Sequence, residues 1–116
     1  MTAAFTEIGR RFGPFDCTIV KIGAYGRAWP DIHLNPEQAL EVHRMVRGKV
    51  FIQAHWATYN LAAHSWHEPV DRLLAALPGS GASVIVPLPG QPIVPSEPPP
   101  LVRWWDALRS GPPPGR

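Results

Sequence analysis

The chain has 116 residues, a length that fits one small domain. Its 11 Lys and Arg residues against 9 Asp and Glu residues give a net charge of +2, and they are scattered, so no basic patch for nucleic acid is indicated. No apolar run approaches the roughly 20 residues of a membrane span, and no apolar segment of a signal peptide follows the start, so a cytoplasmic location is expected. Ten of the 15 prolines lie between Pro87 and Pro114, which predicts a globular part, residues 1–89, and a Pro-rich extended tail, residues 90–116.

The first two predicted elements are a helix and a strand. Phe5, Ile8 and Phe12 recur at the spacing of one helix face, and Gly13 ends the run, which predicts a short amphipathic helix. The segment Cys17–Gly23 is short, mostly apolar and rich in β-branched residues, which is typical of a buried strand.

The strongest helix start in the chain follows a loop. Asn35 precedes Pro36, and Gln38 stands three residues after Asn35, so an N-cap, a proline in the first turn and a capping-box partner coincide. We expect this helix to be ended by a left-handed Gly48. The second buried strand follows at Lys49–Ala54.

A third helix and a third strand complete the pattern. Apolar residues at helical spacing over Val70–Leu77 predict a helix that ends at Pro78, and Ser83–Leu88 predicts a strand. The tail has room for at most one short helix, at residues 101–109, because its prolines are dense. Strands that alternate with helices predict an α/β fold with a β-α-β-α-β core of parallel strands.

The loops after the first two strands hold most of the histidines. In open parallel sheets, ligands bind beyond the carboxyl ends of the strands. Four of the five histidines, His33, His55, His64 and His67, fall in these two loops. His55 directly follows a predicted strand, where an imidazole is placed to bind a metal ion or act as a general base.

Several segments together resemble one enzyme family, in the same order and at the same spacing. They are Phe5–Asp16, Ile22–Tyr25, His33–Ala39, His55–Thr58 and Glu68–Pro69. Over residues 5–89 the chain resembles the C-terminal part of metallo-β-lactamase-fold hydrolases of the N-acylphosphatidylethanolamine-hydrolysing phospholipase D type.

The resemblance implies the C-terminal half of an αββα sandwich whose complete form holds two zinc ions at one edge. It implies that His55 is a metal ligand, that His33 is a catalytic residue at the rim of the site, and that Tyr25 binds substrate. Trp56 and Thr58 are expected to lie behind the ligand and hold it in place. The implied activity is hydrolysis of a phosphodiester or lipid-like small molecule by metal-activated water.

The remaining metal-binding motifs of that family are not in the 116 residues. Its His-x-His-x-Asp-His motif, a further histidine and a bridging aspartate all precede the segment that resembles this chain. Catalytic zinc normally takes three protein ligands, so His33 and His55 need a further ligand from His64, His67 or elsewhere. Ala57 replaces a glycine of the family, which predicts backbone strain if its φ is positive.

Three interpretations stay open. The chain is a truncated hydrolase, or one half of a split hydrolase that needs an N-terminal half as partner. Alternatively, it is a non-catalytic interaction protein that uses bare strand edges or its two proline-x-x-proline segments, Pro89–Pro92 and Pro95–Pro98. In the third, a homodimer brings two copies of His33 and His55 together in one metal site.

Overall fold

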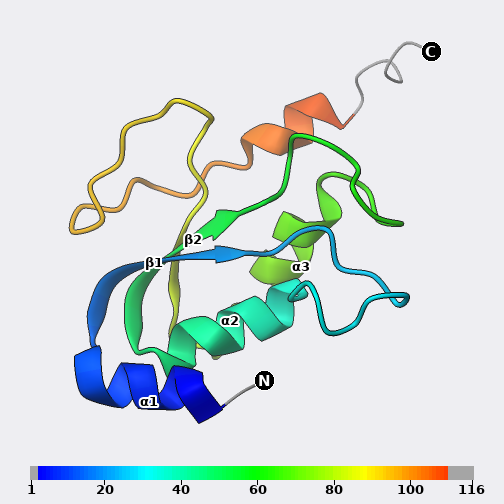
Figure 1. The fold of residues 1–116 in the computed structure, drawn as a ribbon. Helices are drawn as coiled ribbons and strands as arrows, with labels where there is room; N and C mark the ends of the chain where they lie inside the picture. Colours follow the sequence, from blue (N-terminus) through cyan, green and yellow to red (C-terminus); the bar gives the residue numbers. More distant parts are fainter. Residues whose placement is uncertain (1–2, 110–116) are drawn as a thin grey trace.

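The computed structural model describes residues 3–109 and has an α/β fold with three parallel strands alternating with helices (Figure 1). In chain order the elements are helix α1 (Ala3–Phe12), strand β1 (Phe15–Lys21), helix α2 (Pro36–Met45), strand β2 (Gly48–Ala54), helix α3 (Glu68–Ala76), strand β3 (Ser83–Ile85) and the 3-10 helix η1 (Trp104–Leu108). The predicted alternation of strand and helix is therefore confirmed.

The three strands form one sheet in the order β1-β2-β3, with β2 in the centre. Cys17 of β1 lies opposite Val50 of β2, and Val50 lies opposite Ser83 of β3. Because all strands are parallel, their carboxyl ends meet at one edge of the sheet, where the two histidine-bearing loops begin.

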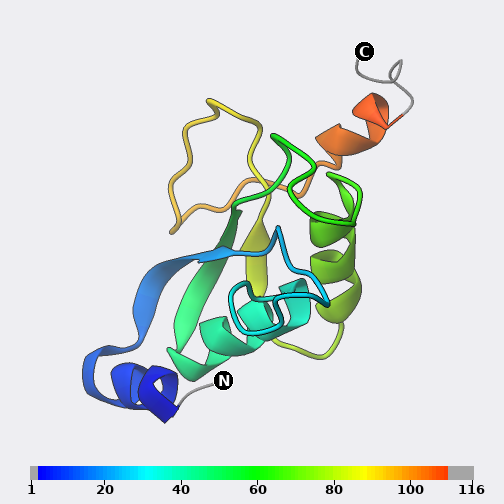
Figure 2. The same cartoon turned by 45° about the vertical axis from the view of Figure 1, so that its right-hand side comes forward.

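The helices α2 and α3 pack side by side, and α2 also packs on β1 and β2 (Figure 2). Their shared core is completed from the tail by Trp105 of η1, which is 0% exposed. The buried residues of this core are Ile22, Ala39, Leu40, Phe51, Val70, Leu73, Val86 and Trp105. Helix α1 packs on α2 through Gly9, where an added Cβ would lie 2.1 Å from the Met45 carbonyl oxygen.

The opposite side of the sheet is only partly covered. Side chains alternate along β1, so that Thr18 faces His43 of α2 while Ile19 points away and is 71% exposed. Ile19, Ile52 and the segment 87–93, which turns at Pro89 and Gly90, border a groove of about 1030 Å³. Among the described residues, no helix is long and apolar enough to cross a membrane.

Several element boundaries differ from the prediction. The left-handed residue after α2 is Arg47, with φ of 60°, whereas Gly48 is already the first residue of β2. Gly48 is needed for packing, because an added Cβ would lie 2.5 Å from His43 Nδ1. Strand β1 spans Phe15–Lys21 rather than 17–23, and β3 stops at Ile85, two residues before Pro87, which has no N–H to donate to a ladder.

Candidate functional site

The two loops start side by side at the carboxyl ends of β1 and β2. The Ile22 N–H donates to the Ala54 carbonyl at 3.0 Å, which extends the ladder to the last residue of β2. Beyond this hydrogen bond the two loops run so close together that an added Cβ at Gly23 would lie 2.1 Å from the His55 carbonyl oxygen. Ala24 and His55 both adopt positive φ, 62° and 61°. Two non-glycine residues in this conformation cost about 1 kcal/mol or more each, which concentrates backbone strain at this edge.

The structure brings the predicted site residues His33 and His55 together. Their rings stack with centroids 5.3 Å apart and planes inclined by 28°. His55 is exposed and His33 is half-buried, and both line a cavity of about 340 Å³. The two rings therefore lie next to each other at this edge, one half-buried and one exposed. This geometry favours different roles for the two histidines.

His33 is also held at its edge by Lys21, the last residue of β1. The Lys21 ammonium donates to the Ile32 carbonyl at 2.8 Å and lies 3.2 Å from His33 Nδ1. Desolvation and the nearby charges of Lys21 and His55 lower the pKa of His33 below its ordinary value.

Tyr25, the predicted substrate-binding residue, lines a second cavity of about 390 Å³ that also contains His33. Its hydroxyl donates to Glu68 Oε1 at 2.7 Å, and the Arg72 guanidinium lies 4.8 Å from its ring centroid. Burial and the contact with Glu68 raise the pKa of Tyr25 to about 12. Tyr25 is therefore a protonated wall of this cavity, with its hydroxyl already engaged.

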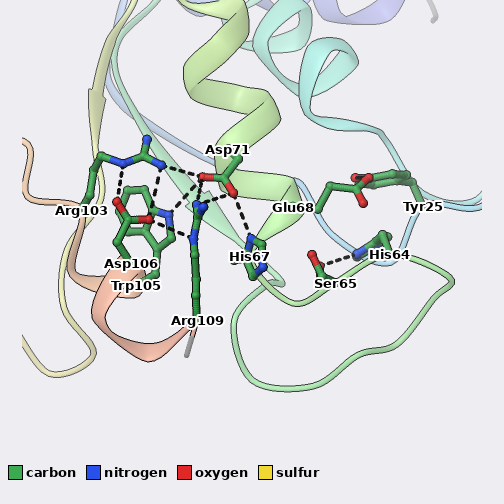
Figure 3. Close-up of polar contacts among 10 residues, drawn as sticks. All are labelled: Tyr25, His64, Ser65, His67, Glu68, Asp71, Arg103, Trp105, Asp106 and Arg109. Carbon is green, nitrogen blue, oxygen red and sulfur yellow. Dashed lines mark hydrogen bonds and ion pairs between the residues drawn. The ribbon is translucent and has the colours of Figure 1, made fainter. Parts of the chain in front are cut away.

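His64 cannot complete a metal site in this arrangement, because both of its ring nitrogens are bonded to backbone. The Ala24 N–H donates to Nε2 at 3.1 Å, and Nδ1 lies 3.0 Å from the Ser65 carbonyl, which only accepts. The ring also stacks on Tyr25 with centroids 4.3 Å apart (Figure 3). His64 thus links the loop after β2 to the strained turn at Ala24 through hydrogen bonds to the backbone.

His67, the other candidate for a further ligand, belongs to a separate cluster around Asp71 of α3 (Figure 3). His67 Nδ1 lies 2.9 Å from Asp71 Oδ2. On the Oδ1 side, Asp71 accepts from the Trp105 indole at 3.1 Å and from Arg103 at 2.9 Å, and Arg109 donates to both oxygens. These bonds fasten the tail to α3.

The pKa of Asp71 reflects this crowding by donors. Burial alone would raise it, but the hydrogen bonds from His67 and Trp105 and the charge of Arg109 outweigh burial and lower it below the ordinary value. Sequence reasoning missed the cluster. Its partners lie 32 to 38 residues from Asp71 on the tail side, and no local pattern pairs residues across that distance.

Trp56 and Thr58 lie on the other side of His55 and line the groove of about 1030 Å³. Trp56 packs against Trp104 and Trp105, with ring centroids 5.7 and 5.9 Å away. Within residues 3–109 neither side chain hydrogen-bonds to His55, so their predicted supporting role stays a prediction. Ala57, which lies between them in the sequence, has φ of 71°. A positive φ is strained for alanine but not for glycine, so the predicted condition for backbone strain at this position is met.

The donors at this edge do not make a zinc site by themselves. Across the described part of the chain, no three His, Cys, Asp or Glu side chains gather closely enough to hold a metal ion. His33 and His55 supply two imidazoles at most, whereas a catalytic zinc normally takes three protein ligands.

Comparison with known proteins agrees with the fold. Residues 2–56 match the model of the beta-lactamase superfamily domain. Uncharacterized proteins of Mycobacterium tuberculosis and Mycobacterium bovis are 50% identical over 107 residues, which is 90% of this chain. The chain spans only 29% of the length of these relatives.

Two further proteins are also similar. The N-acyl-phosphatidylethanolamine-hydrolyzing phospholipase D 1 of Caenorhabditis elegans is 42% identical over 72 residues, which is 60% of this chain and 20% of that protein. Igni18, a metallo hydrolase from the archaeon Ignicoccus hospitalis, superposes with a TM-score of 0.56 at 23% identity, covering 78% of this chain and 35% of that one. The sequence matches identify residues 2–56 as part of a beta-lactamase superfamily domain, and the superposition shows that the chain shares part of the fold of a metallo hydrolase.

Proposed function

We propose that this chain supplies one edge of the active site of a metal-dependent hydrolase that cleaves a phosphodiester, or a related lipid-like ester, with metal-activated water. In this proposal His55 is one metal ligand, His33 contacts the substrate and Tyr25 lines its pocket. The other ligands come from protein outside these 116 residues, either the remainder of a longer chain or a separately encoded half.

The observation that carries the proposal is the stacked pair of His33 and His55 at the carboxyl ends of adjacent parallel strands. His55 keeps a strained backbone, with φ of 61°, and an exposed imidazole, a combination typical of functional sites. The 42% identity to a phospholipase D that hydrolyses N-acyl-phosphatidylethanolamine supports a phosphodiester substrate.

The partly covered sheet face supports the finer assignment, that the chain is the C-terminal half of an αββα sandwich. Ile19 is 71% exposed on this face, and Ile52 beside it borders the large groove. The exposed apolar side chains that line this groove also include Tyr59, Leu88 and Leu108, and exposed apolar patches mark surfaces that pack against another protein segment. We propose that the second sheet of the complete domain covers this face.

A chimera tests the function. In the relative from Mycobacterium tuberculosis, the matching segment of 107 residues is replaced by this chain, which restores the remainder of the domain. The expected result is zinc-dependent hydrolysis of bis(p-nitrophenyl) phosphate, with less zinc bound per chain in the His55→Ala variant. Replacing the residue that hydrogen-bonds to a metal ligand typically lowers activity about 10- to 100-fold. Loss of the ligand itself in His55→Ala should therefore lower activity by on the order of 100-fold or more.

The matched control is His67→Gln, because His67 bonds to Asp71 and not to either member of the histidine pair. This variant should keep both zinc and activity. Equal zinc content and equal activity in the His55→Ala and His67→Gln chimeras would remove His55 from the metal site.

A second candidate function is non-catalytic binding through the same partly covered face, and the large groove with its exposed Ile19 favours it. The chimera separates the two candidates. A folded chimera that holds no zinc and does not cleave the phosphodiester supports the binding protein, whereas zinc-dependent turnover supports the hydrolase.

A further inference from the structure

We propose that Lys21 is a positioning residue for His33: its ammonium holds Nδ1 as an acceptor, so that the ring offers Nε2–H as a donor to an oxyanion. The chemical class of ligand is an anion with an accepting oxygen, such as a phosphate diester. The role towards substrate rests on the proposed function, whereas the state of the ring does not.

The donor and acceptor roles follow from the chemistry of the two groups. An ammonium has three donors and no acceptor, so its contact of 3.2 Å with Nδ1 requires Nδ1 to accept. A neutral imidazole carries one proton, and a ring that accepts at Nδ1 therefore carries it at Nε2. The contact thus selects one tautomer of His33.

The geometry holds Lys21 in place for this role. Lys21 is the last residue of β1 and pairs with Ala54 of β2, so the sheet fixes its backbone. Its ammonium also donates to the carbonyl of Ile32, the residue before His33, at 2.8 Å. Together these contacts tie the loop that carries His33 to the end of β1.

His33 is then restrained from two directions, by Lys21 at the ring edge and by His55 at the ring face. The ring borders both cavities of this edge, of about 340 and about 390 Å³, so there is room beside it for a small polar group. A donor nitrogen next to a lysine charge favours an anionic oxygen, because hydrogen bonds between charged groups are the stronger ones.

This arrangement also separates the roles of the two histidines. With Nδ1 accepting from Lys21 and Nε2 protonated, His33 has no free lone pair to give to a metal ion. Within residues 3–109 no group hydrogen-bonds to the exposed ring of His55, so its nitrogens stay available to a metal ion. Because of its contact with Lys21, His33 can donate to an anion but cannot bind a metal ion, so metal binding is left to His55.

The experiment is nuclear magnetic resonance of the 15N-labelled 116-residue chain, in which two-bond imidazole correlations distinguish protonated from unprotonated ring nitrogens. His33 is assigned by the loss of its signals in His33→Gln. The expected wild-type spectrum has an unprotonated Nδ1 and a protonated Nε2. Lys21→Met should move Nδ1 towards the protonated position, and Lys21→Arg, which keeps a donor, should restore the wild-type pattern.

The matched control is Lys49→Met, because Lys49 pairs with Asp16 and makes no contact with His33. It should leave the His33 signals unchanged. A proton on Nδ1 in the wild type overturns the proposal even if no variant folds. It is equally overturned if the His33 signals of a folded Lys21→Met variant match those of the wild type.

This test stands apart from the proposed function. If the chimera is inactive while His33 shows the expected tautomer and its dependence on Lys21, the hydrolase assignment fails and the positioning role remains. If the chimera is active while Lys21→Met leaves the tautomer unchanged, the hydrolase assignment stands and the role of Lys21 fails.

Discussion

Asp71 fastens the C-terminal tail to the body of the protein, and replacing it with alanine should loosen that attachment. Its carboxylate accepts from Arg103, Arg109 and the indole of Trp105, and Trp105 lies fully buried in the core (Figure 3). Asp71→Ala removes these acceptors at once.

The magnitude can be worked out partner by partner. The side chains of Arg103 and Arg109 are 44% and 33% exposed, so each of their ion pairs is worth about 0.2–1 kcal/mol. The indole N–H of Trp105 would be left buried without a partner, which costs about 1–3 kcal/mol. The expected loss for Asp71→Ala is therefore about 1–5 kcal/mol.

Asp106→Ala is the matched control. Asp106 pairs with the same two arginines, but it is exposed and makes no hydrogen bond to Trp105 in the described part of the chain. Its loss should cost less than the loss of Asp71, because ion pairs of a fully exposed carboxylate are screened by water and no buried donor is left without a partner. Urea unfolding followed by circular dichroism gives both values from the midpoints at constant slope.

The Asp71 contribution should also depend on pH. The pKa of Asp71 is lowered in the folded state, so its stabilisation is complete above the unfolded value of about 3.9 and is lost as pH falls through the folded value. Wild type should therefore lose more stability than Asp71→Ala below about pH 4. If Asp71→Ala is no more destabilising than Asp106→Ala at neutral pH, the bond to Trp105 does not hold the tail and the reasoning is refuted.

Three further predictions concern the core and the strained turns. Burial lowers the pKa of His43 in the folded protein. The stability that neutral His43 contributes is therefore complete above about pH 6.5 and declines as pH falls through the lowered value. The urea midpoints at pH 7.5 and pH 5.5 should consequently differ less in His43→Gln than in the wild type. Ala57→Gly should be neutral or slightly stabilising, because relief of about 1 kcal/mol of strain at positive φ offsets about 0.4–1 kcal/mol of chain entropy. The control Ala75→Gly in α3 should cost about 1 kcal/mol. Equal losses of stability for the two variants in thermal unfolding would contradict backbone strain at Ala57. Gly48→Ala should destabilise by about 1–3 kcal/mol in urea unfolding, because its Cβ would lie 2.6 Å from Thr18 Cγ2, and an unchanged midpoint would show that the site has room.

Local signals in the sequence were sufficient for most of the secondary structure. The N-cap at Asn35 and its partner Gln38 form the predicted capping box, because a cap depends on residues three positions apart. The two apolar strands and the apolar spacing of α3 were also correct in kind, since each depends on a periodicity inside one short segment. His33 and His55 were foreseen at one edge because parallel strands end together.

Only the tertiary structure decided what the other loop histidines do. His64 satisfies the backbone of Ala24, 40 residues away, and His67 joins an Asp71 cluster whose arginines and indole come from the tail. Long-range pairs of this kind leave no periodicity in the chain, because they depend on how the loops and the tail pack after the sheet has formed. The same reason places Trp105, from a segment whose composition predicted only an extended tail with one short helix, at the centre of the core.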